Sequence, residues 1–453
     1  MPLAARITPE LLDRYDRPGP RYTSYPPIPS WSAEFHEADY RSALADLARL
    51  PDQPVALYLH LPFCVARCWY CGCNATVTRH DHVQESYVGR VIREMGMVSD
   101  VLGERRLAAE IHWGGGTPNF LGPAAMEQLA TAVHERFRWA PGVAVGIEID
   151  PRVASAEQLG RLRQLGFNRL SIGVQDFDPA VQQAIGRIQS EPLVAELRDA
   201  ARELGFGSVN FDLVYGLPGQ TEGSFARTLQ RVVEMAPDRV ACFGYAHVPW
   251  ARPNQRRIDT AALPDRYQRF ALFRLAVETL TEAGYRWIGL DHFARPSDEL
   301  SIALDAGRLR RTFMGYVPDP APHLLAFGTS AIGEVAGRLV QNDAHLGRYQ
   351  RAIDAGQLPI VRGHALSGED RVRRAAIEQL LCTLELPYTT LAHLGDDDDP
   401  LARFRPFADE GLVRFDADRL VVTSAGRFVL RNLAMELDAY ADGASSTRFS
   451  RTV

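Results

Sequence analysis

The chain has 453 residues, which is too long for a single compact core and indicates two or three domains. Hydrophobic residues make up 46% of it, charged residues make up 23%, and the formal net charge is −6. This composition is ordinary for a globular protein, and no apolar run reaches the roughly 18 residues of a membrane span. We therefore expect neither nucleic acid nor a membrane as a partner.

Lysine is absent from the sequence, so all 50 basic residues are arginine. A Schiff-base mechanism needs a lysine amine, and so does the phosphate-binding loop of an NTPase. Both reaction classes are therefore excluded. The N-terminal residues contain no apolar segment of the kind that a secretory signal needs. We expect a cytoplasmic chain in a reducing compartment, without disulfides.

Residues 1–50 are polar and rich in proline, and they include the cluster RYTSYPP at 21–27. Such a composition predicts an N-terminal arm of irregular structure that lies on a larger body.

Between residues 51 and 255, short apolar or β-branched runs alternate with helical stretches rich in Ala, Leu and Arg. The runs are ALYLHLP (56–62), EIHWGGGTP (110–118), VGIEIDP (145–151), RLSIGVQDF (169–177), VNFDLVYGLP (209–218) and VACFGYAHVP (240–249). They predict six parallel βαβ units in an α/β fold, and we favour a partial (β/α)6 TIM-like barrel over a doubly wound sheet. In either fold, ligands bind at the carboxyl ends of the strands.

The pattern changes after residue 255. Residues 256–365 are expected to hold an extension of the barrel and linker elements, including an amphipathic helix over 263–283 that ends at Gly284. Residues 366–453 predict helices followed by a β-hairpin and a last helix, which is a mostly helical, winged-helix-like domain. Because no basic recognition helix is evident, we expect this domain to act in packing or as a lid rather than in reading DNA.

Four of the six cysteines fall within ten residues, in the segment HLPFCVARCWYCGCN. Cys64, Cys68 and Cys71 have the spacing C-x3-C-x2-C, so one short loop can supply three thiolates to a cubane cluster and leave its fourth iron open. A structural zinc site normally adds a second, distant ligand pair, and an electron-transfer cluster usually has four cysteines. Cys73 follows closely, and we expect it to lie outside the ligand set.

This spacing after a first strand resembles the radical S-adenosylmethionine superfamily, in which the methionyl amine and carboxylate chelate the open iron. Three accessory features agree with the resemblance. GGGTP at 114–118 is a glycine turn that lets the backbone approach the methionine moiety closely. Glu148 ends the third strand and suits ribose hydroxyls, and Tyr70 can stack near adenine.

Within that superfamily the chain resembles the oxygen-independent coproporphyrinogen III oxidases, or coproporphyrinogen dehydrogenases, from RYTSYPP to the C-terminal FSRTV. The motifs that carry the resemblance are LYLHLPFC, CGCN, HWGGGTP, EIDPR, GVQDF, DLVYGLPGQT, YAHVP and GLDHFARPSDEL. The resemblance implies a [4Fe-4S] cluster and two S-adenosylmethionine molecules. The first molecule would be held by Tyr58, Tyr70, Gly115 and Glu148. The second would contact Gly116, Thr117, Gln175, Arg187, Asp212, Ala246 and Ile332.

The activity that the resemblance implies is the oxidative decarboxylation of two propionates of coproporphyrinogen III to vinyl groups, through 5′-deoxyadenosyl radicals, which gives protoporphyrinogen IX in haem biosynthesis. A low-potential donor such as flavodoxin or ferredoxin would reduce the cluster, and we expect a monomer. Arginines would hold the carboxylates of the substrate by bidentate contacts.

Several alternatives stay open. Tyr58 and His60 alternate on the first strand and face the barrel interior, so we assign them catalytic roles, although His60 could be a satisfied core histidine. Without the resemblance, a surface ion pair or a helix cap would explain Arg187 and Asp212 equally well. On the same scaffold, the chain could instead be a haem-binding chaperone or another porphyrin-modifying radical enzyme. The alternative from a different class is an electron-transfer protein.

Overall fold

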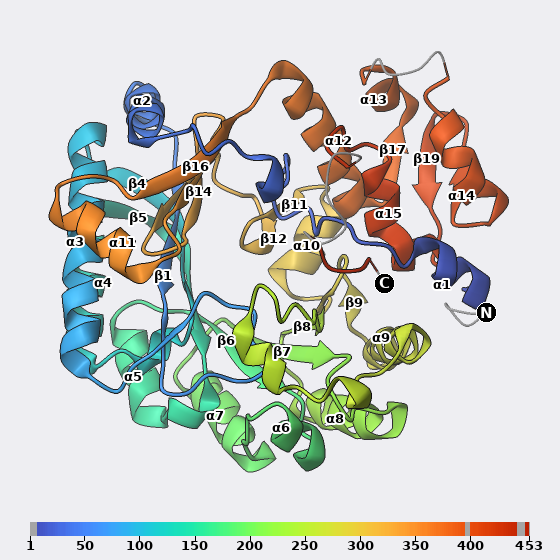
Figure 1. Ribbon diagram of the computed structural model, residues 1–453, viewed down its shortest axis with the longest axis horizontal. Coiled ribbons are helices and arrows are strands. Elements are labelled where there is room, and N and C mark those ends of the chain that lie inside the picture. Colours follow the sequence, from blue (N-terminus) through green and yellow to red (C-terminus); the bar gives the residue numbers. More distant parts are fainter. Residues whose placement is uncertain (1–6, 395–398, 442–448, 453) are drawn as a thin grey trace.

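The computed structural model describes residues 7–394, 399–441 and 449–452. Its centre is a curved sheet whose middle consists of six neighbouring parallel strands (Figure 1). They are β1 (Val55–Leu61), β4 (Arg106–Gly115), β5 (Phe137–Ile149), β6 (Arg169–Gln175), β7 (Ser208–Tyr215) and β8 (Arg239–Gly244). Each corresponds to one of the six predicted runs, so the partial (β/α)6 barrel is confirmed.

Further strands extend this sheet at both edges to a total of 12. Beside β1 lie β13 (His323–Phe327), which is parallel to it, and then the antiparallel strands β14 (Ile332–Val335), β15 (Arg338–Asn342) and β16 (Ile360–Ala365). Beside β8 lie the antiparallel strands β10 (His292–Ala294) and β9 (Arg286–Trp287). The segment 256–365 thus contributes to both edges of the sheet.

Helices cover the outer face of the parallel strands (Figure 1). They are α3 (Asp81–Leu102), α4 (Pro123–Arg136), α5 (Ala156–Gln164), α6 (Pro179–Ala184), α7 (Glu191–Glu203), α8 (Glu222–Met235) and α9 (Arg266–Glu282). Side chains such as Ser155, Thr221 and Asp265 cap their first turns by accepting from backbone N–H groups. The helix predicted over 263–283 is α9, and Gly284 follows it with a φ of 87°.

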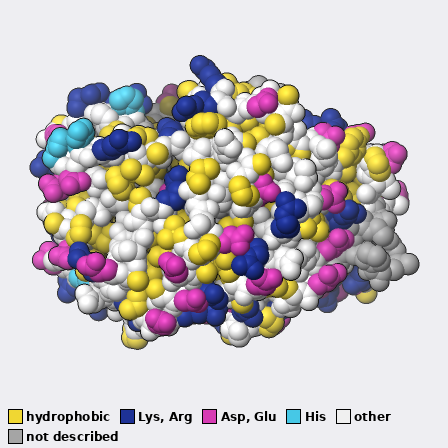
Figure 2. Space-filling view, turned by 90° about the horizontal axis from the view of Figure 1, so that it is seen from below, with side chains coloured by type: hydrophobic (Ala, Val, Ile, Leu, Met, Phe, Trp, Pro, Cys, Tyr) yellow, Lys and Arg dark blue, Asp and Glu magenta, His cyan; other side chains and the backbone are white. Residues whose placement is uncertain are grey.

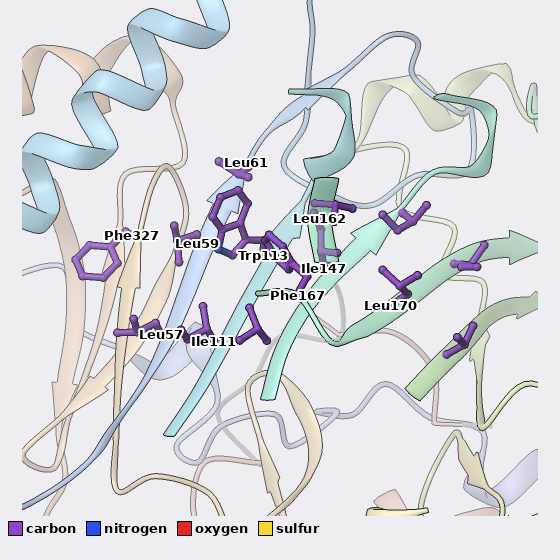
Figure 3. Close-up of a cluster of buried hydrophobic side chains, with 14 of the residues drawn as sticks. Leu57, Leu59, Leu61, Ile111, Trp113, Ile147, Leu162, Phe167, Leu170 and Phe327 are labelled. Carbon is purple, nitrogen blue, oxygen red and sulfur yellow. The ribbon is translucent and has the colours of Figure 1, made fainter. Parts of the chain in front are cut away.

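The main hydrophobic core lies between the sheet and these helices (Figure 3). Leu57 and Leu59 of β1 pair with Ile111 and Trp113 of β4, and all four side chains are buried against the helical layer. Successive side chains of a strand point to opposite faces. The polar residues between these apolar ones therefore face the interior of the barrel.

The prediction of an irregular N-terminal arm is wrong for two segments, α1 (Pro9–Tyr15) and α2 (Glu37–Ala48). In α2, Tyr40, Ala43, Leu44 and Leu47 form a buried stripe at helical spacing, and this stripe joins the main core. The stripe stabilises a helix that the proline-rich flanks obscure in the sequence.

The C-terminal domain lies beside the open edge of the barrel near β8 to β10 (Figure 1). It contains α12 (Gly368–Thr383), β17 (Glu385–Pro387), α13 (Tyr388–Ala392), α14 (Arg405–Asp409), β18 (Val413–Phe415), β19 (Arg419–Val422) and α15 (Leu430–Met435). The predicted helices and hairpin are present, and β17 adds a third strand. Three tyrosines of the arm, Tyr15, Tyr22 and Tyr25, are buried in the core of this domain.

Four further short elements lie between the barrel and the C-terminal domain in the chain. They are α10 (Glu299–Asp305), β11 (Leu309–Thr312), β12 (Gly315–Pro318) and α11 (Leu346–Asp354). On the face in Figure 2, arginines and carboxylates are interspersed with apolar side chains. Over the described residues, every helix is too short or too polar to span a bilayer.

Candidate active site

The cysteine loop begins at the carboxyl end of β1, where the strand pair β2 (Phe63–Cys64) and β3 (Thr76–Val77) brackets it. Two amides far away in the sequence hold its backbone. Asn254 Nδ2 donates to three carbonyl oxygens within residues 68–71, at 3.0 to 3.2 Å. Gln255 Nε2 donates to the carbonyl oxygen of Tyr70 at 2.8 Å. Sequence reasoning missed both amides, because side chains that bind only backbone leave no motif.

Each of the three predicted ligand sulfurs accepts hydrogen bonds. The pairs are Thr117 Oγ1 to Cys64 Sγ at 3.2 Å, Arg152 Nη2 and Arg187 Nη1 to Cys68 Sγ at 3.5 and 3.7 Å, and the Cys73 N–H to Cys71 Sγ at 3.4 Å. Hydrogen bonds to sulfur and nearby cations favour thiolates and tune the potential of a cluster that they bind. The donor set therefore suits an iron-sulfur cluster.

The protonation of the thiols differs along the loop. Burial raises the pKa of Cys64 to about 11, whereas the Cys73 side chain, by hydrogen bonding, lowers the pKa of Cys71 to about 6. Among the described residues, no three His, Cys, Asp or Glu side chains are grouped closely enough to hold a single metal ion. In a cubane cluster, each thiolate binds a different iron. The three sulfurs therefore need not converge on one point, as they must around a single ion.

The glycine turn after β4 lies directly against β1. The Gly115 N–H donates to Glu148 Oε2 at 3.0 Å, and Gly115 has a φ of 117°. A Cβ atom at this position would lie 2.7 Å from the His60 ring, so only glycine fits. Tyr58 and His60 are joined by a 3.2 Å hydrogen bond, and His60 Nε2 lies 3.0 Å from the carbonyl oxygen of Asn74. The structure thus brings four predicted residues together: Tyr58, His60, Gly115 and Glu148.

Gly116 and Thr117 fix this turn to the cysteine loop. The Gly116 N–H donates to the Leu61 carbonyl and the Thr117 N–H donates to the Phe63 carbonyl, both at 2.9 Å. A Cβ atom on Gly116 would lie 2.6 Å from the Pro62 backbone. The glycines therefore permit a close approach of two backbone segments.

A cavity of 560 Å³ occupies the interior of the barrel, and Glu148 and Asp212 line it. Although burial opposes ionisation, His112 and the Gly115 N–H lower the pKa of Glu148. Burial raises the pKa of Asp212 to about 6, and Asp212 accepts hydrogen bonds from Ser171 and Asn210, both at 2.8 Å. His112 Nε2 lies 3.6 Å from Glu148 Oε1. His112 was not predicted as a site residue. The signal in the sequence is that it stands two residues before the glycine turn and that its side chain points to the face opposite that of Trp113.

Arg187 is buried beside the cysteine loop, so the alternative of a surface ion pair is wrong. Its side chain is 7% exposed, and its Nη1 atom lies 3.1 Å from Asp150 Oδ2. Its Nη2 atom donates to the Gly173 carbonyl at 2.7 Å. Gly173 belongs to β6, and Gln175 ends this strand with a φ of 65°. The Gln175 side chain approaches Gly173. Asp212 lies inside β7, so it is not a helix cap.

Three other predicted residues lie in separate parts of the fold. Tyr70 packs against an apolar cluster that includes Val214 and Tyr245. Ala246 lines a second cavity, of 370 Å³, beyond β8. Ile332 is buried with Trp31 and borders a third cavity, of 260 Å³.

An open α/β barrel with a three-cysteine loop at its carboxyl edge is the architecture of a radical S-adenosylmethionine domain, and residues 58–232 match the Radical SAM superfamily. Residues 366–429 match the HemN C-terminal domain.

The nearly full-length similarities are more specific. The chain is 41% identical to the oxygen-independent coproporphyrinogen III oxidase of Pseudomonas aeruginosa, with 98% of each chain covered. It is 38% identical to the enzyme of that name from Synechocystis sp., with 98% of this chain and 97% of the relative covered. The solved coproporphyrinogen III oxidase (HemN) from Escherichia coli, described as a radical SAM enzyme, matches with a TM-score of 0.88 and 39% identity over 93% of this chain and 97% of that one. The chain belongs to the oxygen-independent coproporphyrinogen III oxidase family. The predicted family and its [4Fe-4S] and S-adenosylmethionine cofactors are thus confirmed.

Proposed function

We propose that this chain catalyses the oxygen-independent oxidative decarboxylation of two propionates of coproporphyrinogen III, which gives protoporphyrinogen IX. The observation that carries the proposal is the 41% identity over 98% of the chain, which includes the C-terminal domain as well as the barrel. In each decarboxylation, a hydrogen atom leaves the carbon β to the carboxylate, and CO2 and one electron then leave to form the vinyl group.

Cys64, Cys68 and Cys71 would hold the cluster, and Cys73 would remain outside it. The hydrogen bonds that all three sulfurs accept support this assignment. Cys73 is exposed, and its backbone N–H donates to Cys71 Sγ. This bond does not depend on the Cys73 side chain. When bound, the cluster and S-adenosylmethionine supply the 5′-deoxyadenosyl radical.

The first S-adenosylmethionine would be held by Tyr58, Tyr70, Gly115 and Glu148. The open backbone at Gly115 suits the amino acid end of this molecule, and an ionised Glu148 suits ribose hydroxyls. The second molecule would contact Gly116, Thr117, Gln175, Arg187, Asp212, Ala246 and Ile332. Ala246 and Ile332 lie toward neighbouring cavities, so their contacts are the least supported by this geometry.

Tyr58 and His60 would position the reacting groups at the carboxyl end of β1. Burial lowers the pKa of His60, so its imidazole is neutral near pH 7, with Nε2 donating to the Asn74 carbonyl and Nδ1 accepting from the Tyr58 hydroxyl. We further propose a low-potential donor such as flavodoxin or ferredoxin, a monomeric state and a cytoplasmic location.

The test is an anaerobic assay of the reconstituted protein with coproporphyrinogen III, S-adenosylmethionine and a reductant. We expect two CO2 and two 5′-deoxyadenosine per protoporphyrinogen formed. If haem binds stoichiometrically and no protoporphyrinogen appears, the protein is a haem-binding relative and the proposal is wrong.

A further inference from the structure

The second cavity lies beyond the carboxyl end of β8, between the barrel, the N-terminal arm and the C-terminal domain. Six arginines line it: Arg21, Arg269, Arg311, Arg427, Arg431 and Arg451. Among the described lining residues, Asp291 is the one carboxylate. We call this space the arginine cavity. Its charge contrasts with the mixed charges of the outer surface in Figure 2.

Most of these arginines have no carboxylate partner among the described residues. Arg451 pairs with Asp16 at 2.6 Å. The guanidinium groups of Arg21, Arg311, Arg427 and Arg431 donate only to backbone carbonyls or to a serine hydroxyl. Asp291 is itself bound by His292 Nδ1 at 2.7 Å. Asp291 interacts electrostatically with Arg21 and Arg311, but one carboxylate cannot balance five arginines that form no ion pair within the described chain.

Arg269 and Arg311 each have a buried guanidinium nitrogen without a hydrogen-bond partner among the described residues. For Arg269, the structure gives no hydrogen-bond or ion-pair partner to the side chain among the described residues, and its Nε atom is buried. Arg311 is 8% exposed, and its buried Nη1 atom has no partner. Burying an unpaired polar or charged group is costly, so a ligand carboxylate that bonded to these two nitrogens would stabilise both side chains.

Burial and neighbouring positive charge disfavour the ionised form of two arginines of the cavity. Burial, reinforced by the charge of Arg21, lowers the pKa of Arg431 to about 9. Burial also lowers the pKa of Arg427 to about 10. A bound carboxylate would offset both effects, because an opposite charge favours the ionised form.

Three phenylalanines give the cavity an apolar wall. Phe270 and Phe273 of α9 each contact Phe428 of the C-terminal domain edge to face. Aromatic walls combined with guanidinium groups suit a large ligand whose pyrrole rings pack on the phenylalanines and whose carboxylates reach the arginines.

One side chain links the arginine cavity to the cysteine loop. Gln255 Nε2 donates both to the Tyr70 carbonyl, at 2.8 Å, and to the Ala246 carbonyl, at 3.1 Å. Ala246 lines the arginine cavity, and Tyr70 stands between the second and third cysteines. A ligand in the cavity would therefore lie beside the predicted radical source.

We propose that the arginine cavity binds propionate carboxylates of the tetrapyrrole substrate, with Arg269 and Arg311 as its principal carboxylate contacts. This inference rests on the proposed function, because it takes its ligand from the same reaction. It also assigns a role to the C-terminal domain and to the arm, which contribute Arg427, Arg431 and Arg21 to the cavity.

The test is equilibrium binding of coproporphyrin III, the stable oxidised form of the substrate, to the cluster-loaded protein by fluorescence. We compare the wild type with Arg269→Gln, Arg311→Gln and the double variant. The matched control is Arg362→Gln on β16, at the opposite edge of the sheet. Coproporphyrin III tetramethyl ester serves as the uncharged ligand. Cluster absorption and thermal unfolding report whether each variant is folded.

We expect each single variant to weaken coproporphyrin III binding about tenfold or more, and the double variant to weaken it further. Arg362→Gln should bind coproporphyrin III with the wild-type affinity. Every variant should bind the tetramethyl ester with the wild-type affinity. Wild-type binding by both arginine variants, or equal losses for the acid and the ester, overturns the inference. If the wild type converts coproporphyrinogen III while the variants bind and turn over normally, the inference fails and the proposed function stands. If coproporphyrin III binds through these arginines and no conversion occurs, the proposed function fails and the carboxylate site stands.

Discussion

Arg187 and Asp150 form a buried ion pair that borders the cysteine loop, with 3.1 Å between Nη1 and Oδ2. The same Nη1 atom lies 3.7 Å from Cys68 Sγ. Arg152 joins the pair, because its Nη2 atom lies 2.6 Å from Asp150 Oδ2 and 3.5 Å from Cys68 Sγ. Asp150 thus holds two guanidinium groups against one ligand sulfur.

Replacing Asp150 by Asn should lower the free energy of unfolding by about 3 kcal/mol, since two buried cations would lose their counterion. Chemical denaturation of the anaerobic protein measures this change. The control is Asp354→Asn, which removes the partner of Arg90 in a surface ion pair where Asp354 is 45% exposed. That change should cost less than about 1 kcal/mol. Equal losses of unfolding free energy in the two variants would show that the buried ion pair stabilises the protein no more than the surface pair does.

Replacing Cys64, Cys68 or Cys71 singly by Ser should abolish the absorption and the electron paramagnetic resonance signal of the reduced [4Fe-4S] cluster, together with the cleavage of S-adenosylmethionine. Cys73→Ser should keep both, because the backbone N–H of residue 73 still donates to Cys71 Sγ when the side chain is changed. Iron and sulfide content per chain provides the measurement. Loss of the cluster from Cys73→Ser would move this cysteine into the ligand set.

The six central parallel strands could be predicted from the sequence because each has a continuous apolar or alternating run, and five of these runs end in Pro. The strands at the two edges of the sheet could not. β9 has two residues, Arg286 and Trp287, and β10 has three, so they exist only through pairing with β8 and with each other. The pairing of β13 with β1 joins residues more than 260 positions apart, which no local pattern encodes.

The candidate site divides in the same way. The three cysteines and the glycine turn form compact motifs, so their roles could be predicted from spacing. Asn254 and Gln255 hold the same loop from about 185 residues away and bind only backbone groups. The arginine cavity gathers its lining from both termini, from α9 and from the C-terminal domain. Its existence follows from the packing of these parts and not from any one segment.

Replacing Gly115 by Ala should weaken S-adenosylmethionine binding and lower stability by about 1 to 3 kcal/mol, because φ is positive and the added Cβ would meet the His60 ring. Gly89→Ala provides a control of opposite sign. Gly89 is exposed within α3, and a Cβ there meets nothing within 4 Å. This control should raise stability by about 1 kcal/mol through helix propensity. Thermal unfolding and equilibrium binding of S-adenosylmethionine measure both variants, and normal binding by Gly115→Ala would contradict the assignment of the turn.

Glu94 of α3 gives the protein a specific dependence of stability on pH. Its carboxylate accepts hydrogen bonds from the Gly328 N–H at 2.8 Å, the Tyr349 hydroxyl at 2.7 Å and Asn342 Nδ2 at 2.6 Å. Burial nevertheless raises its pKa from 4.5 to about 7. The folded state therefore binds this proton more tightly than the unfolded state, and ionisation of Glu94 opposes folding.

The contribution of Glu94 to stability is full below pH 4.5 and is lost as the pH rises to about 7, and the loss amounts to about 3 kcal/mol. Glu94→Gln cannot ionise, so its unfolding free energy should lack this decline. The unfolding free energy of the wild type minus that of Glu94→Gln should fall by that amount between pH 4.5 and 8. Urea denaturation at a series of pH values measures it. Glu135→Gln, at a site where the carboxylate is 67% exposed, should keep the wild-type slope. A difference that does not change with pH would mean that Glu94 ionises in the folded chain as readily as in the unfolded one.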